Sequence, residues 1–292
     1  MKIALAQYPI GKFASLADWQ ANAARWVEEA AGNGARLLVF PEYGGMELTA
    51  LLPEALQKDL RGQIPALEKF HADFVSTYAA LAQKHSVFIQ APSSPVMADG
   101  AMHNRVYFFA PSGAHDFQDK RQMTRFEKEE WGVAGGGTLK IFDIGETKIG
   151  IAICYDIEFP LIAHAMAKAG AELILAPSCT DTMAGANRVH VGARARALEN
   201  QIYVAVAPTV GDAPWSPAVD VNVGWAAVYA MPDRGFPDDG ILARGELNKP
   251  GWIYVELDFP LLRAARANAQ VFTRTDWDSQ SQPSLAVTQN TF

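Results

Sequence analysis

The sequence has few of the features that would place a protein outside the cytoplasm or on a nucleic acid. Only two cysteines occur in 292 residues, too few for the disulfide framework of small secreted domains. No stretch reaches the ~18 consecutive apolar residues of a membrane span, and polar Gln7 interrupts the first apolar run too early for a signal peptide. Lys and Arg number 25 against 32 Asp and Glu, a formal net charge of −7, whereas nucleic-acid-binding proteins usually carry a basic patch. We expect a cytoplasmic protein with reduced cysteines that binds neither nucleic acid nor membrane.

The sequence also lacks the motifs that hold metals and common cofactors. Its six histidines show no His-Glu-x-x-His pattern and no metal-like pairing. The glycine run at 135–137 is not followed by the Lys-Ser/Thr of a phosphate-binding loop, and the Gly-x-Ser-x-Gly elbow of the α/β-hydrolases does not occur. We therefore expect no metal and no cofactor, with the chemistry supplied by side chains alone.

What is present is an alternation of short β-branched strands with helical patterns. Hydrophobic residues make up 49% of the chain, and no linker, charge block or repeat divides it. Helix–strand pairs at both ends and hairpins in the middle predict a single α/β domain over residues 1–275, followed by a polar tail over residues 276–292. The main predicted strands cover residues 2–8, 36–40, 86–90, 104–110, 148–153, 172–176, 202–207, 222–230 and 251–257, and the main helices residues 15–31, 66–84, 161–169, 184–200 and 261–269.

Three segments place a chemically useful side chain just after a predicted strand. Glu42 follows the strand at 36–40, where burial would raise the carboxyl pKa into the range of a general base. Lys120 lies in a basic cluster that follows a strand predicted over 114–118. A fixed cation there would hold a developing negative charge, with Glu127 as its ion partner. Cys154 ends another strand before a tight turn into a helix, where free backbone N–H groups would lower the thiol pKa and form an oxyanion site.

Each of these segments, taken alone, also has a purely structural interpretation. Glu42 would simply begin a solvated loop, and the basic cluster around Lys120 would be a solvated loop of its own. A lone cysteine such as Cys154 is more often a small core residue than a nucleophile. The occurrence of all three in one chain is what favours chemistry.

In this order the three segments resemble the motifs of the nitrilase superfamily, the carbon–nitrogen hydrolases. The matching segments are Phe40-Pro41-Glu42, Asp119-Lys120 through Glu127, and Cys154-Tyr155-Asp156 through Phe159-Pro160, with further similarity at Gln7, Ala176-Pro177-Ser178 and Arg196-Ala197-Leu198-Glu199-Asn200. The resemblance implies a four-layer α-β-β-α sandwich. It also implies a homodimer or higher homo-oligomer packed through outer helices, with the tail over residues 276–292 as an arm that crosses to the partner or, alternatively, as a disordered chain end.

The resemblance further implies a hydrolase of non-peptide carbon–nitrogen bonds, most simply an amidase for a small aliphatic amide. Glu42 would be the general base and Cys154 the nucleophile that forms a thioester. Lys120 and the backbone N–H of Tyr155 would hold the oxyanion, and Glu127 would position Lys120. An N-carbamoyl hydrolase or a nitrilase on the same triad is one alternative, and a non-catalytic binding or scaffold member of the fold is another.

The motif around the cysteine departs from the family pattern at one position. Glu158 stands where many amidase-like members carry Arg, which inverts the charge beside the proposed nucleophile. Cys154-Tyr155-Asp156 is nearer to the aliphatic and ω-amidase branches than to true nitrilases. Together with Phe40-Pro41-Glu42-Tyr43, it resembles a branch sometimes found fused to an acetyltransferase. The residues expected to line the substrate pocket are Tyr43, Cys179 and Thr180.

Overall fold

The computed structural model describes residues 1–281 and 287–291, and the strands of this part form one continuous 15-stranded sheet system. Its main path runs through β4 (Ser94–Ala98), β5 (Ala101–Phe109), β3 (Phe88–Gln90), β2 (Leu37–Val39), β1 (Lys2–Pro9), β11 (Tyr203–Asp212), β10 (Leu173–Ser178), β9 (Lys148–Ile151) and β8 (Ile141–Asp143). Off this path, β6 (His115–Asp119) and β7 (Val133–Ala134) pair with β5, β15 (Gly251–Glu256) with β1, β12 (Val221–Asn222) with β11, and β13 (Ala227–Tyr229) with β11 and β14 (Ile241–Arg244).

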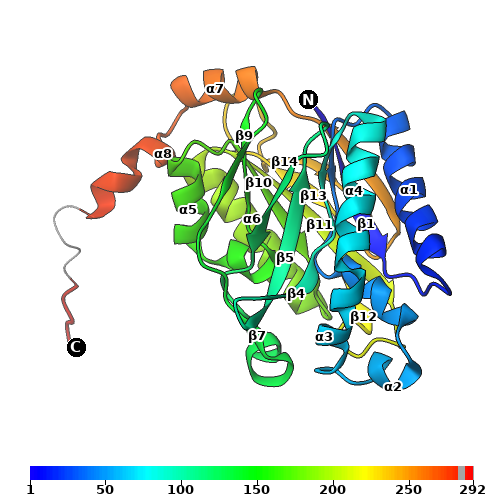
Figure 1. The fold of residues 1–292 in the computed structure, drawn as a ribbon. Helices are drawn as coiled ribbons and strands as arrows, with labels where there is room; N and C mark the ends of the chain where they lie inside the picture. Colours follow the sequence, from blue (N-terminus) through cyan, green and yellow to red (C-terminus); the bar gives the residue numbers. More distant parts are fainter. Residues whose placement is uncertain (282–286, 292) are drawn as a thin grey trace.

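The helices of the described residues lie outside this sheet system. The α-helices are α1 (Leu16–Gly32), α2 (Glu54–Gln57), α3 (Gln63–Leu67), α4 (His71–His85), α5 (Pro160–Lys168), α6 (Met183–Asn200), α7 (Phe259–Ala267) and α8 (Thr273–Asp276). Shorter helical turns are η1 (Gly44–Leu51), η2 (Glu68–Phe70), the π-helical η3 (Phe126–Trp131), η4 (Cys154–Glu158) and η5 (Trp277–Ser281). Figure 1 shows α1 and α4 on one flank of the strands and α5 and α6 on the opposite flank. None of the helices in residues 1–281 and 287–291 has the length and apolar character needed to cross a membrane.

Strand β1 joins two half-sheets, and its side chains alternate between two cores. It pairs with β11 at Tyr8–Thr209 and Pro9–Val210, where the two half-sheets meet. Ile3 and Leu5 are buried in the same cluster as the side chains of β9, β10 and β11. Ala4 and Ala6, on the other face of β1, are buried with side chains of α1 and α4. This alternation is the period of two that every strand imposes. The layers are therefore helix, half-sheet, half-sheet and helix, and the predicted α-β-β-α sandwich is confirmed.

Helix α1 forms where the sequence pattern predicts it. The Ser15 hydroxyl caps its first turn by accepting a hydrogen bond from the Asp18 backbone N–H at 3.1 Å. The buried residues of α1 recur at helical spacing and pack towards the first half-sheet: Trp19, Ala23, Trp26, Val27 and Ala30.

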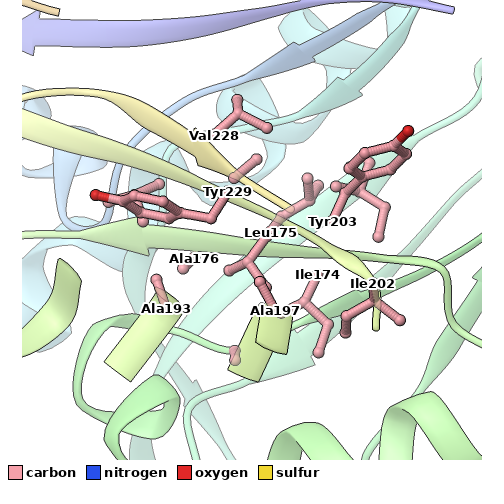
Figure 2. Close-up of a cluster of buried hydrophobic side chains, with 14 of the residues drawn as sticks. Ile174, Leu175, Ala176, Ala193, Ala197, Ile202, Tyr203, Val228 and Tyr229 are labelled. Atoms are coloured by element: carbon pink, nitrogen blue, oxygen red, sulfur yellow. The ribbon is translucent and has the colours of Figure 1, made fainter. Parts of the chain in front are cut away.

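The second helical layer covers β10 and β11 closely because α6 presents small residues to them. Figure 2 shows Ala193 and Ala197 of α6 among the buried side chains of β10, β11 and β13, including Leu175 and Tyr203. Gly192 allows the same helix to touch η4, since a Cβ there would lie 2.9 Å from the Ile157 carbonyl oxygen. Helix α6 therefore fixes the turn that begins with Cys154.

Three predicted elements differ from the structure. The helix predicted over 66–84 begins at His71 as α4, because α3 and η2 occupy the preceding residues. The strand predicted over 222–230 is divided into β12 and β13, and between them the Val223 N–H leaves the ladder to donate to the Thr180 carbonyl at 2.7 Å. The polar tail, for which no helix was predicted, begins with the end of α8 and with η5, where the Trp277 ring stacks on His164 at 4.2 Å.

The rest of that tail is only partly covered, because residues 282–286 and 292 lie outside the described residues. Three predictions remain untested: the single domain over residues 1–275, the arm that crosses to a partner, and the homodimer or higher homo-oligomer.

Candidate active site

The three residues proposed as catalytic come from distant segments and meet at one cavity of about 630 Å³. Glu42 follows β2, and Cys154 follows β9. These strands run parallel to β1 and β10 respectively, and β1 and β10 both run parallel to β11, so the carboxyl ends of β2 and β9 point the same way. Lys120 directly follows β6, at the same end of the sandwich, and all three side chains line the cavity.

Glu42 is held by three hydrogen bonds inside the protein. It is 1% exposed. Its Oε1 accepts from Lys120 Nζ and from Asn104 Nδ2, each at 2.8 Å, and its Oε2 accepts from the Cys179 backbone N–H at 2.9 Å. Burial raises the pKa of the Glu42 carboxyl to about 7, and Glu127 adds to the shift while the Lys120 ammonium opposes it. Such a carboxyl can both accept and return a proton near neutral pH.

Lys120 lies between two carboxylates. Its Nζ donates to Glu42 Oε1 and to both carboxylate oxygens of Glu127, each at 2.8 Å. Burial alone would lower the pKa of Lys120, but Glu42 and Glu127 outweigh burial and raise that pKa well above its ordinary value. Burial likewise would raise the pKa of Glu127, yet the Lys120 ammonium holds it below its ordinary range. Lys120 is therefore a permanent cation, and Glu127 a permanent anion that fixes it.

Cys154 is the first residue of η4 and adopts a left-handed backbone with φ of 48°. Its Sγ donates to the Cys179 carbonyl oxygen at 3.6 Å. Burial and the negative charge of Glu42 raise the pKa of the thiol well above its ordinary value, although Lys120 opposes them. This direction is opposite to the one that the helical turn alone would give, so the resting thiol is protonated and needs a base to become a nucleophile.

Two buried polar residues complete the arrangement and were not predicted. Asn104 in β5 is 0% exposed and binds Glu42. Asp156 accepts backbone N–H bonds from Arg121 at 3.1 Å and Gln122 at 2.7 Å, which ties the segment after Lys120 to the turn after Cys154. Asp156 belongs to the quoted cysteine motif, so its position was visible in the sequence, whereas Asn104 stands between His103 and Arg105 in β5 and nothing in the sequence singled it out.

Tyr43, Cys179 and Thr180, which were predicted to line the substrate pocket, are among the residues that line this cavity. The Tyr43 hydroxyl donates to Glu127 Oε1 at 2.7 Å. Cys179 acts through its main chain, since its N–H binds Glu42 and its carbonyl binds the Cys154 thiol. Within residues 1–281 and 287–291, no group of three or more His, Cys, Asp or Glu side chains is arranged to hold a metal ion.

Comparison with known proteins gives the family. A model of the family described as "Carbon-nitrogen hydrolase" matches residues 2–267. The chain belongs to the carbon–nitrogen hydrolase family. This is a family of hydrolase enzymes, and the resemblance to the nitrilase superfamily stated above is confirmed.

Three relatives show how this carbon–nitrogen hydrolase compares with its family. It is 31% identical to the "Probable hydrolase YhcX" of Bacillus subtilis (strain 168) over 271 residues, which cover 93% of this chain and 52% of that protein, so it spans about half of this relative's length. It is 28% identical to "Omega-amidase NIT2" of Danio rerio over 236 residues, 77% of each chain. The crystal structure of Saccharomyces cerevisiae Nit3, described as a member of branch 10 of the nitrilase superfamily, superposes with a TM-score of 0.73 at 23% identity, covering 92% of this chain and 93% of Nit3. The superposition shows that the fold is shared.

Proposed function

We propose that this carbon–nitrogen hydrolase converts a small aliphatic amide into a carboxylic acid and ammonia through a thioester on Cys154. The observation that carries the proposal is the cavity in which a buried carboxyl with a pKa of about 7, a fixed cation and a thiol all face the same space. A nucleophile, a base to activate it and a charge where the oxyanion develops are the groups that acyl transfer needs. Similarity to an ω-amidase supports an amide as the substrate.

The first half of the proposed reaction forms the thioester. Glu42 takes the proton of the Cys154 thiol, and the thiolate attacks the amide carbon. The resulting oxyanion is held by the Lys120 ammonium and by the backbone N–H of Tyr155. When the tetrahedral intermediate collapses, the C–N bond breaks and the proton on Glu42 passes to the nitrogen, which leaves as ammonia.

The second half releases the acid. A water enters where ammonia left, Glu42 takes one of its protons, and the hydroxide attacks the thioester carbon. Collapse breaks the C–S bond, and Glu42 returns its proton to the thiolate. Glu42 thus moves one proton in each direction during each half, which requires a carboxyl whose pKa lies near the working pH.

One experiment tests this proposal against its alternatives. The protein is incubated with small aliphatic amides, N-carbamoyl amino acids and nitriles while ammonia is followed, and the mass of the intact chain is measured for an acyl adduct. Ammonia from amides with an adduct at Cys154 supports the amidase. Turnover confined to carbamoyl compounds or to nitriles would replace the amidase with the corresponding hydrolase, and no turnover with any compound would favour a non-catalytic binding member.

The pH dependence of catalysis follows from the pKa of Glu42. Because only the ionised carboxyl can take the thiol proton, kcat/KM is expected to fall as the pH drops through about 7. Glu127 raises the pKa of Glu42, so Glu127→Gln should move this acid limb to lower pH. The control is Glu129→Gln, which removes an exposed carboxylate bound to Arg125 and should leave the limb in place. If the acid limb of the kcat/KM profile keeps its position or moves to higher pH in Glu127→Gln, this result would argue against Glu42 as the base.

A further inference from the structure

A second charged pair lies on the wall of the cavity, away from the Glu42–Lys120–Glu127 cluster. Glu158 is the last residue of η4, the turn that begins with Cys154, and its side chain is 22% exposed. Arg188 in α6 is 62% exposed and lies with its Nε 3.6 Å from Glu158 Oε1. Both residues line the cavity. The exposed fractions show that Glu158 is the more deeply buried of the two, and the 3.6 Å separation is longer than a hydrogen bond, so Arg188 holds it only loosely.

The backbone that carries this pair is fixed by close packing. Helix α6 crosses η4 so tightly that a Cβ on Gly192 would lie 2.9 Å from the Ile157 carbonyl and 3.4 Å from Glu158 Cα. Glu158 therefore has a defined position relative to Cys154, four residues earlier. Arg188 has the opposite character, because its mostly exposed side chain can turn into solvent while Glu158 stays in place.

The other charges of the cavity wall leave a surplus of negative charge. Lys120 is already bound by two carboxylates, and Arg125 is bound by Glu129 through hydrogen bonds of 2.9 and 3.0 Å. The remaining acidic residues of the wall are Glu158, Asp181 and Asp220, and the remaining basic residues are Lys128 and Arg188. Burial raises the pKa of Glu158, with Arg188 and Lys120 opposing the shift, so this carboxylate is partly desolvated while its ion partner Arg188 is mostly exposed. A cation placed beside it would be stabilised.

We propose that Glu158 is a specificity residue which binds a protonated amino group, so that the enzyme selects small amides carrying an ammonium group away from the scissile bond. The assignment rests on the proposed amidase function and names its substrate class. The ammonium takes the place of the Arg188 guanidinium at Glu158, and Arg188 turns towards solvent. A substrate carboxylate at the same place would face Glu158 and is disfavoured.

Three amides of matched length test the charge preference: 5-aminopentanamide, hexanamide and the monoamide of adipic acid. For the unaltered enzyme, kcat/KM should be about tenfold higher for the cationic amide than for the neutral one, and lowest for the anionic one. Glu158→Gln should bring the cationic-to-neutral ratio close to one, mainly through KM, and Glu158→Arg should reverse the order of the two charged amides. Glu246→Gln, which removes an exposed carboxylate paired with Lys249 outside the cavity wall, is the matched control and should keep the original ratio. A ratio that Glu158→Gln does not change would overturn the proposal while leaving the amidase function intact.

A second measurement does not depend on hydrolysis. Methanethiosulfonates with an aminoethyl, a methyl or a sulfonatoethyl group are reacted with the protein, and peptide masses give the rate at Cys154. The aminoethyl reagent should react fastest relative to its rate with a free thiol, and Glu158→Gln should abolish that advantage. If no amide is hydrolysed but this preference is found, the cation site stands and the amidase proposal fails. If the rates at Cys154 show no charge preference, the cation site is rejected.

Discussion

Replacing Cys154 with alanine is expected to abolish ammonia release, with kcat/KM falling by at least about 10⁴-fold. The acyl adduct should disappear from the intact mass at the same time. The reason is that no second thiol is placed to take over: burial raises the pKa of Cys179 to about 12, and its Sγ donates to Asn222 Oδ1 at 3.3 Å. Stopped-time ammonia assays and mass spectrometry on the same samples check both parts of the expectation.

The matched control is Cys179→Ala, which removes the other cysteine of the chain. Cys179 contacts Glu42 and Cys154 through its backbone N–H and carbonyl, and alanine keeps both groups. We therefore expect kcat/KM to fall by less than about tenfold, since only a cavity-wall contact changes. Equal losses in the two variants would mean that the fold around the cavity has collapsed, and unaltered ammonia release from Cys154→Ala would refute the thioester mechanism.

Replacing Lys120 with methionine should have the largest effect on stability. The variant buries the carboxylates of Glu42 and Glu127 without the ammonium that separates them, and breaking a buried ion pair in this way costs about 3–5 kcal/mol. Activity should also fall, by about 10²–10³-fold, because the oxyanion loses its cation. Urea unfolding at pH 8 and ammonia assays measure the two effects separately.

The pH and a second substitution distinguish this explanation from general damage. Without Lys120 the pKa of Glu42 rises further in the folded state, because the lowering influence of the ammonium is gone. A carboxyl whose folded pKa is raised favours the fold at pH values below its unfolded pKa and loses that contribution as the pH rises. The stability gap between the variant and the unaltered protein should therefore narrow at pH 5.5. Combining Lys120→Met with Glu127→Gln should recover part of the stability without recovering activity. A stability gap that neither the lower pH nor Glu127→Gln reduces would contradict the explanation by unpaired buried carboxylates.

The sequence contained the reactive groups of the site but not the contacts that align them. Glu42, Lys120 and Cys154 were predicted because each follows a predicted strand and because the three segments, in this order, resemble the motifs of the nitrilase superfamily. The bond from Asn104 to Glu42 and the main-chain contacts of Cys179 were not predictable, because they depend on how two half-sheets are placed face to face. A one-residue change of register would direct these groups to the other side of their strands.

The same distinction applies to the fold. Helix α1 was predicted to within a residue because its cap and its apolar period are local properties of the chain. The division of the strand predicted over 222–230 was not, because it depends on Thr180, a residue some forty positions away that accepts the Val223 N–H. Long-range hydrogen bonds of this kind leave no local pattern to read.

The pairing of β1 with β15 has a consequence for the order in which the protein can be assembled during synthesis. β1 leaves the ribosome well before β15, its antiparallel partner, which pairs residues 251–256 with residues 2–7. Until β15 emerges, a strand at the middle of the sandwich has one edge without a partner, and unpaired edges of apolar strands are where nascent chains associate wrongly. The first half-sheet can therefore be completed only after β15 has been synthesised, and the hydrogen bonds between β1 and β15 form late in folding.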